Sequence, residues 1–92
     1  MKFTLYGMMI CPDCEEAVQI LNKKQIPYTF ADFTEETTNL KEFLKIRDGN
    51  PLFDDVRREG NIGIPCFAFE NGTVLLSLED ALEYIASDGE DI

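Results

Sequence analysis

Two cysteines lie close together near the amino end of the chain, in the segment GMMICPDCEEAV. Cys11 and Cys14 bracket a proline and an aspartate, so they form a C-x-x-C pattern. Thiols at this spacing can exchange with a disulfide, supply half of a metal site, or fill a core as small apolar side chains. The rest of the sequence has to distinguish a redox couple from the other two.

Counting ligands tests the metal alternative. A structural zinc site is normally built from four cysteine or histidine side chains. This chain has no histidine and three cysteines, the third being Cys66. The sequence therefore argues against an intrachain zinc site, and we expect no metal. Small secreted domains usually carry several disulfides, a pattern that three cysteines do not match.

The two thiols are expected where a strand passes into a helix. The alternating segment KFTLY predicts a strand over residues 2–6. The segment CPDCEEAVQILNKK predicts a helix with Pro12 in its first turn. Cys11 then caps this helix and Cys14 lies one turn inside it, a placement typical of redox motifs.

Cys11 is the expected nucleophile of the pair. Free N–H groups and the dipole at the start of a helix stabilise an anion, and so favour a thiolate at the cap. The acidic side chains of Asp13, Glu15 and Glu16 oppose this effect, and the sequence leaves the balance open. Because Cys14 lies further inside the turn, we expect Cys11 to attack a disulfide and Cys14 to resolve the product.

The remaining segments alternate between strands and helices. YTFADF predicts a strand at about 28–33, and the apolar stripe that follows predicts a helix capped by Thr34. NPLFDDVRREG predicts a short extra helix over roughly 51–59, capped by Asn50. CFAFE and TVLLS flank the turn signal NG and predict a hairpin. Ser77 is expected to cap a last helix, and the closing DGEDI to be frayed.

This order predicts an α/β fold in a single domain that spans residues 1–92. The first two strands, joined through a helix, should pair in parallel. The hairpin should add antiparallel strands. We therefore expect a four-stranded mixed sheet, built as a βαβ unit followed by a β-hairpin and a carboxyl-terminal helix, with helices on both faces.

The charge balance excludes several partners. Eight basic residues face 18 acidic ones, a net charge of -10. Nucleic acids and anionic membranes attract the opposite sign of charge, so we expect neither as a partner. The sequence lacks the run of about 20 apolar residues that a membrane helix needs, and its first residues do not resemble a signal peptide. We expect a cytoplasmic monomer.

Three segments together resemble the glutaredoxin family of the thioredoxin-fold superfamily. They are KFTLYGMMICPDC, GIPCF and ENGTVLL, and the resemblance runs from Phe3 to Ile85. It implies a thioredoxin-like fold and thiol–disulfide oxidoreduction by Cys11 and Cys14. Pro65 is implied to be a cis-proline that faces them. The resemblance further implies substrate or glutathione contacts at Met9, Pro12, Ile64 and Pro65, with the backbone of Ile64 pairing with the ligand.

The chain departs from the family around the glutathione site. Asp13 stands where a tyrosine is usual, and Met8 stands where a basic residue is usual. The segment LLSLED lacks the family's Gly-Gly, and the segment 48–62 is longer than the matching loop. Glutathione is anionic and acidic neighbours repel it. The expected electron donor is therefore either glutathione or a thioredoxin-type reductase, and the expected substrate is a protein or small-molecule disulfide.

Other interpretations stay open at this point. The pair could instead serve a redox sensor, or Cys11 with glutathione could share an iron–sulfur cluster between two chains, as in some glutaredoxins. Cys66 is more often a core side chain than a catalyst, although it directly follows Pro65. The apolar stretch of Met8, Met9 and Ile10 is either core filling or, if exposed, a rim on which a protein substrate docks.

Overall fold

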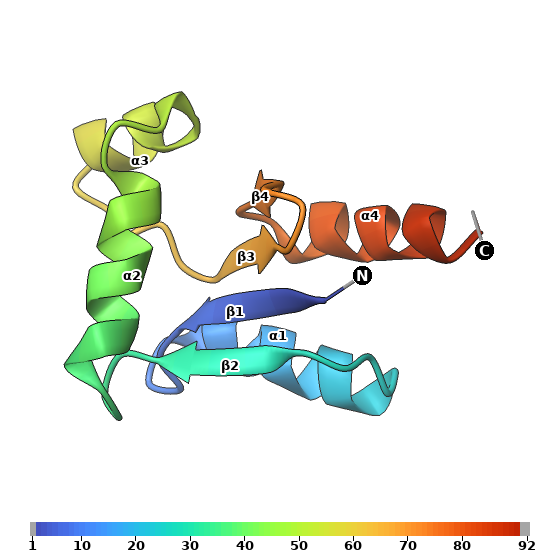
Figure 1. Cartoon of the computed structure of the whole chain (residues 1–92). Helices are drawn as coiled ribbons and strands as arrows, with labels where there is room; N and C mark the ends of the chain where they lie inside the picture. Colours follow the sequence, from blue (N-terminus) through green and yellow to red (C-terminus); the bar gives the residue numbers. More distant parts are fainter. Residues whose placement is uncertain (1, 91–92) are drawn as a thin grey trace.

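The computed structural model describes residues 2–90, with side chains up to residue 87. Its elements in chain order are β1 (Phe3–Gly7), α1 (Pro12–Lys23), β2 (Thr29–Asp32), α2 (Thr37–Arg47), the 3-10 turn η1 (Pro51–Phe53), α3 (Asp54–Arg58), β3 (Cys66–Phe69), β4 (Val74–Leu75) and α4 (Leu78–Glu90). The predicted order of strands and helices is confirmed, including the extra helix (Figure 1).

The four strands form one mixed sheet in the order β2-β1-β3-β4. β1 and β2 pair in parallel, as the helical connection through α1 requires. β1 pairs with β3, and β3 with β4, in antiparallel register. The expected four-stranded mixed sheet is therefore confirmed. β1 is one of its two central strands, and the chain passes from β1 through a short loop to the thiol pair at the start of α1.

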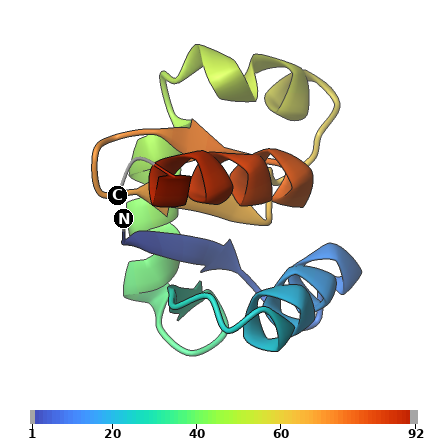
Figure 2. The same cartoon turned by 90° about the vertical axis from the view of Figure 1, so that its right-hand side faces the viewer.

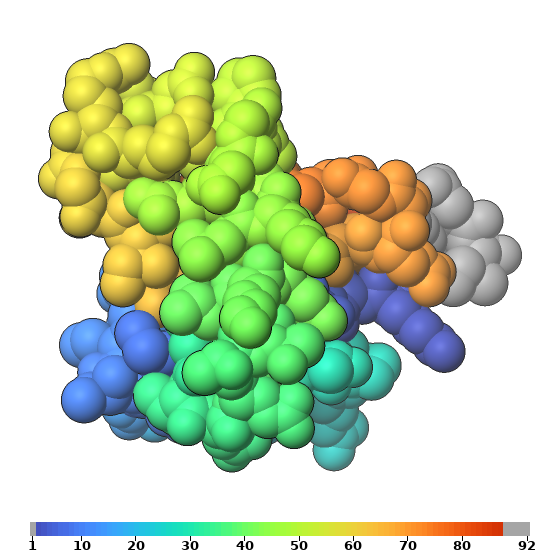
Figure 3. Space-filling model, turned by 60° about the vertical axis from the view of Figure 1, so that its left-hand side comes forward, coloured from blue at the N-terminus to red at the C-terminus, as the bar shows by residue number. Residues whose placement is uncertain are grey.

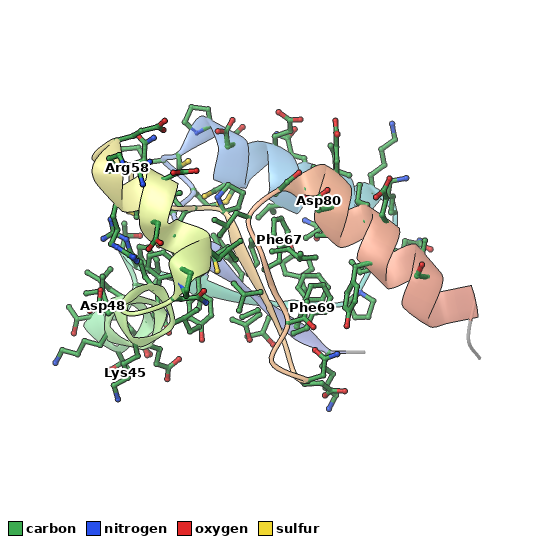
Figure 4. All side chains as sticks on the ribbon, turned by 90° about the horizontal axis from the view of Figure 1, so that it is seen from above. Lys45, Asp48, Arg58, Phe67, Phe69 and Asp80 are labelled. Atoms are coloured by element: carbon green, nitrogen blue, oxygen red, sulfur yellow. The ribbon has the colours of Figure 1, made fainter. Side chains whose placement is uncertain are left out.

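Alternating side chains of the central strands divide the core into two parts. Phe67 and Phe69 of β3 point to the face covered by α1 and α4, where they pack with Phe3 and Leu5 of β1 (Figure 4). Cys66 of β3 points to the opposite face, where a second core cluster lies. Its other buried residues come from β1, β2, α2 and η1: Tyr6, Ala31, Phe43 and Phe53. Helices thus lie on both faces, as predicted.

The helices are arranged differently on the two faces. α4 lies in front of the hairpin strands and α1 beside it when the molecule is turned as in Figure 2. α2 runs crosswise to the strands, beyond the arrowheads of β1 and β2 (Figure 1). α3 follows α2 and lies at the same end of the molecule (Figure 1). This end is also where α1 begins, so the extra helix is close to the thiol pair.

The cap predicted at Thr34 is wrong. Helix α2 begins at Thr37 with Glu36 as its cap residue. The carboxylate of Asp32, at the end of β2, accepts hydrogen bonds from both the backbone N–H and the hydroxyl of Thr34, at 2.7 and 2.6 Å. These bonds hold Thr34 in a turn, which is a common alternative for such side chains, and the helix starts three residues later.

Two other predicted caps are confirmed. The Asn50 side chain accepts a hydrogen bond of 3.0 Å from the N–H of Leu52, and Ser77 Oγ accepts one of 3.4 Å from Asp80. Helix α4 continues to Glu90. Residues 91–92, the last two of the segment expected to be frayed, lie outside the described part. Over residues 2–90, no helix combines the length and apolar character needed to cross a membrane.

Candidate functional site

Cys11 is the cap residue of α1. Its backbone is extended, with φ -81° and ψ 121°, and Pro12 occupies the first helical position, as the sequence predicts. The preceding loop is closed by a 3.0 Å hydrogen bond that the N–H of Cys11 donates to the carbonyl of Met8. The Cys11 thiol is half-buried, so one side of the sulfur is open to a substrate.

Cys14 lies one turn further along α1 and is fully buried. Burial is the main cause that raises the pKa of Cys14 to about 12, and the neighbouring Cys11 thiol raises it further. A backbone hydrogen bond from Met8 acts in the opposite direction. Cys14 is therefore a protonated thiol at neutral pH.

Gly7 makes room for this buried thiol. A Cβ added at Gly7, the last residue of β1, would lie 2.5 Å from the Sγ of Cys14. No real Cβ approaches a sulfur so closely, so a side chain at this position would displace the thiol. The end of β1 and the first turn of α1 therefore pack together at Gly7 and Cys14, and the missing side chain of Gly7 allows the Cys14 sulfur to lie against the strand.

Cys11 opens into a groove of about 630 Å³. One side of the groove comes from the loop before α1 and the first turn of α1: Met8, Ile10, Cys11 and Asp13. The rest comes from α3, from the segment after it and from the residue after β4: Val56, Gly60, Asn61, Ile62, Gly63, Ile64 and Leu76. On the corresponding side of the molecule, the yellow α3 segment stands above the blue amino-terminal part of α1 (Figure 3). The groove thus lies between the thiol pair and the extra helix.

The wall formed by the extra helix is the part of the site that the sequence did not predict. The chain returns from α3 at Gly63, whose φ of +99° favours glycine. A Cβ at Gly63 would lie 3.0 Å from the ring of Phe53 and 3.2 Å from Val56. Phe53 is itself fully buried. The wall is therefore anchored to the core on the α2 face, and the positive φ of Gly63 permits the close approach.

The structure brings only some of the implied ligand residues to this groove. Ile64 lines it, whereas Met9 and Pro12 do not appear among its lining residues. The Ile64–Pro65 peptide bond is cis, as the resemblance implies. Pro65 is buried and lines a neighbouring hollow of about 210 Å³, which shares Asp13 and Leu76 with the groove.

Cys66 lies apart from the thiol pair. Its side chain is fully buried on the α2 face of the sheet, among Tyr6, Phe43 and Phe53, whereas Cys14 belongs to α1 on the other face. Burial raises the pKa of Cys66 to about 12. The structure thus favours the interpretation of Cys66 as a core side chain. In the described part of the chain, no three Cys, Asp or Glu side chains are grouped so as to hold a metal ion.

The apolar residues before Cys11 are partly exposed. Met8 is half-buried and lines the groove. Met9 is 43% exposed and Ile10 is 83% exposed. The alternative that this stretch fills the core is therefore wrong for Met9 and Ile10. Ile10 stands at the edge of the groove, and Ile62, 45% exposed, stands at its α3 side.

Comparisons with known proteins give one relative. The chain is 34% identical over 77 residues to an uncharacterized protein of Haemophilus influenzae, a match that covers 84% of this chain and 90% of that protein. No family model matches the chain, and no solved structure matches it. The name of the relative states no activity, so the geometry of the thiol pair and its groove has to carry any functional argument.

Proposed function

The chain belongs to the same family as the uncharacterized Haemophilus influenzae protein, and we propose that it is a thiol–disulfide oxidoreductase that acts through Cys11 and Cys14. One observation carries this proposal. A half-buried thiol at the cap of a helix opens into a groove, and a second, fully buried thiol lies in the first turn of the same helix. An exposed nucleophile with a protected partner is the arrangement that disulfide exchange requires.

The reaction has two steps. The Cys11 thiolate attacks one sulfur of a substrate disulfide, an S–S bond forms between Cys11 and the substrate, and the other substrate sulfur leaves as a thiolate that takes up a proton. Cys14 then loses its proton and attacks the Sγ of Cys11, and the second substrate thiol is released. In total the substrate gains two electrons and two protons, and Cys11 and Cys14 become a disulfide.

We also propose that the fold is thioredoxin-like and that the chain is a divergent glutaredoxin. The strand order β2-β1-β3-β4 with one parallel pair supports this proposal. So do the thiols after β1 and the cis-proline immediately before β3. The oxidised protein is returned to the dithiol by glutathione or by a thioredoxin-type reductase, which are its proposed electron donors.

The proposal is tested by turnover with each donor. The reduced protein is given bis(2-hydroxyethyl) disulfide, a small uncharged substrate, together with either glutathione and its reductase or a thioredoxin-type reductase and NADPH. We expect turnover with at least one donor, its loss in Cys11→Ser, and its retention in the matched control Cys66→Ala. No turnover with either donor, or equal turnover in Cys11→Ser, would contradict the proposed function.

A further inference from the structure

The groove beside Cys11 points to a particular class of substrate. We propose that it binds a polypeptide segment in which an apolar side chain and a basic side chain flank the disulfide-bonded cysteine, in preference to anionic glutathione. This inference rests on the proposed function, because it names the substrate of the same thiol pair. It is argued from the walls of the groove and from the charges that line it.

Two exposed apolar side chains line the groove. Ile10, before the reactive thiol, is 83% exposed, and Ile62, after α3, is 45% exposed. Both line the groove, together with Val56, Ile64 and Leu76. An apolar side chain of a substrate that enters this groove removes both isoleucines from water, which favours binding.

The charge inside the groove has one sign. Among the described residues that line it, Asp13 is the only charged side chain. The neighbouring hollow shares Asp13 and adds Glu16. A substrate bound across the groove and the hollow therefore meets two carboxylates and no cation in their lining. Lys or Arg next to the substrate cysteine complements this pair, whereas the carboxylates of glutathione are repelled.

The nearest cations of the extra helix are engaged elsewhere. Arg57 forms an ion pair with Asp54 and donates a 2.7 Å hydrogen bond to the carbonyl of Arg47. Arg58 of α3, labelled in Figure 4, forms a 2.6 Å ion pair with Asp55. Neither arginine lines the groove. The extra helix therefore contributes apolar surface to the site while its positive charges are neutralised by its own aspartates.

The inference is tested with matched disulfides and the pre-reduced protein, so that no electron donor enters the measurement. Three peptides of equal length each carry one cysteine in a mixed disulfide with 2-mercaptoethanol. The cysteine is flanked by leucine and lysine in the first, by leucine and glutamate in the second, and by serine and lysine in the third. Glutathione disulfide and bis(2-hydroxyethyl) disulfide complete the set, and the second-order rate constant of protein oxidation is measured for each.

We expect the leucine–lysine peptide to react fastest and glutathione disulfide to react slowest. Ile62→Ser should reduce the preference for leucine over serine by about tenfold, the amount expected when an apolar contact of this size is lost. Leu52→Ser is the matched control, because Leu52 is 47% exposed but does not line the groove. It should leave the preference unchanged.

The charge preference has its own pair of variants. Asp13→Asn should reduce the preference for lysine over glutamate by about threefold or more, and added salt should weaken the same preference in the unaltered protein. The control is Glu15→Gln. Glu15 lies in the same turn of α1 as Asp13, but it lines neither the groove nor the hollow. This variant should keep most of the discrimination.

The outcomes separate this inference from the proposed function. Equal rate constants for all peptides and for glutathione disulfide, with bis(2-hydroxyethyl) disulfide also reduced, would overturn the inference and leave the proposed function standing. The same holds if glutathione disulfide reacts fastest. Failure to react even with bis(2-hydroxyethyl) disulfide would overturn both. The expected ranking, lost in Ile62→Ser and Asp13→Asn but kept in their controls, would support the inference.

Discussion

Gly7 and Cys14 are in such close contact that a Cβ on Gly7 would lie 2.5 Å from the Cys14 sulfur. Gly7 ends the central strand β1 and Cys14 lies in the first turn of α1. The absence of a side chain on one residue therefore sets the position of the thiol on the other. Since Cys11 caps the same helical turn, the same contact helps to set where the Cys14 sulfur lies relative to Cys11.

Gly7→Ala should displace the Cys14 thiol from Cys11. We expect a loss of about 1–3 kcal/mol in the free energy of unfolding, the usual cost of overpacking, and a longer-lived mixed disulfide with substrate. Urea unfolding and intact-mass spectrometry measure the two effects. In a Cys14→Ala background the sulfur is gone, so Gly7→Ala should cost much less stability there. An equal cost in both backgrounds would show that the contact is not responsible.

The resolving step should accelerate with pH. Burial is the main cause that raises the pKa of Cys14 to about 12, and this cause persists when Cys11 is tied up in a mixed disulfide. Well below the pKa, the thiolate fraction of Cys14 grows about tenfold per pH unit. The rate of mixed-disulfide resolution, measured by rapid acid quench, should rise by about that factor per unit from neutral pH upward. A rate independent of pH would contradict the assigned role of Cys14.

Cys66 should contribute to stability and not to turnover. It is fully buried in the cluster on the α2 face, so Cys66→Ala should cost about 1–2 kcal/mol of stability while disulfide reduction continues. A loss of turnover in a folded Cys66→Ala protein would place this thiol in the reaction after all.

The contribution of Cys66 should also depend on pH. Burial raises its pKa from the ordinary value of 9.0 to about 12. Between these values the folded protein holds a proton that the unfolded chain has released, so stability falls as pH rises. The contribution is complete below pH 9 and is lost toward pH 12. Urea unfolding under reducing conditions should therefore show a weaker alkaline loss in Cys66→Ala than in the unaltered protein, and identical pH profiles would contradict this account.

Gly63→Ala should disrupt the wall of the groove. A non-glycine residue at a φ of +99° costs about 1–3 kcal/mol, and its Cβ would also press on Phe53 and Val56. Gly49→Ala is the control, because Gly49 has a φ of +80° with open space around it. Thermal unfolding should show a larger loss for Gly63→Ala than for Gly49→Ala. Equal losses would mean that the packing of the wall adds nothing.

The local parts of the fold could be predicted from the sequence. Pro12 at the first helical position and the side chain of Asn50 at its cap act on neighbouring backbone groups, so their effect is visible in a few adjacent letters. The parallel pairing of β1 and β2 follows from the length of the connecting helix. Thr34 misled the prediction because Asp32, two residues before it, competes for its hydrogen bonds.

The groove could not be predicted in the same way. It depends on where the chain returns after α3. This place is determined by the close approach of Gly63 to Phe53 and Val56, which lie within the inserted segment 48–62. The place of Cys66 depends on the register of β3 against β1, which pairs it with Tyr6 and turns it to the α2 face. The segment GIPCF predicts a proline at the start of a strand, and the family resemblance implies its cis bond, but neither indicates the face to which the following thiol points.

The most direct test of the central claim is a trapping measurement on Cys14→Ser. The reduced variant is mixed with bis(2-hydroxyethyl) disulfide at neutral pH, and intact-mass spectrometry with peptide mapping locates any adduct. We predict one stable 2-mercaptoethanol adduct on Cys11, its absence in Cys11→Ser, and in the unaltered protein a disulfide between Cys11 and Cys14 with Cys66 still reduced. A Cys11 that takes up no adduct, or an adduct that forms first on Cys66, would contradict the account.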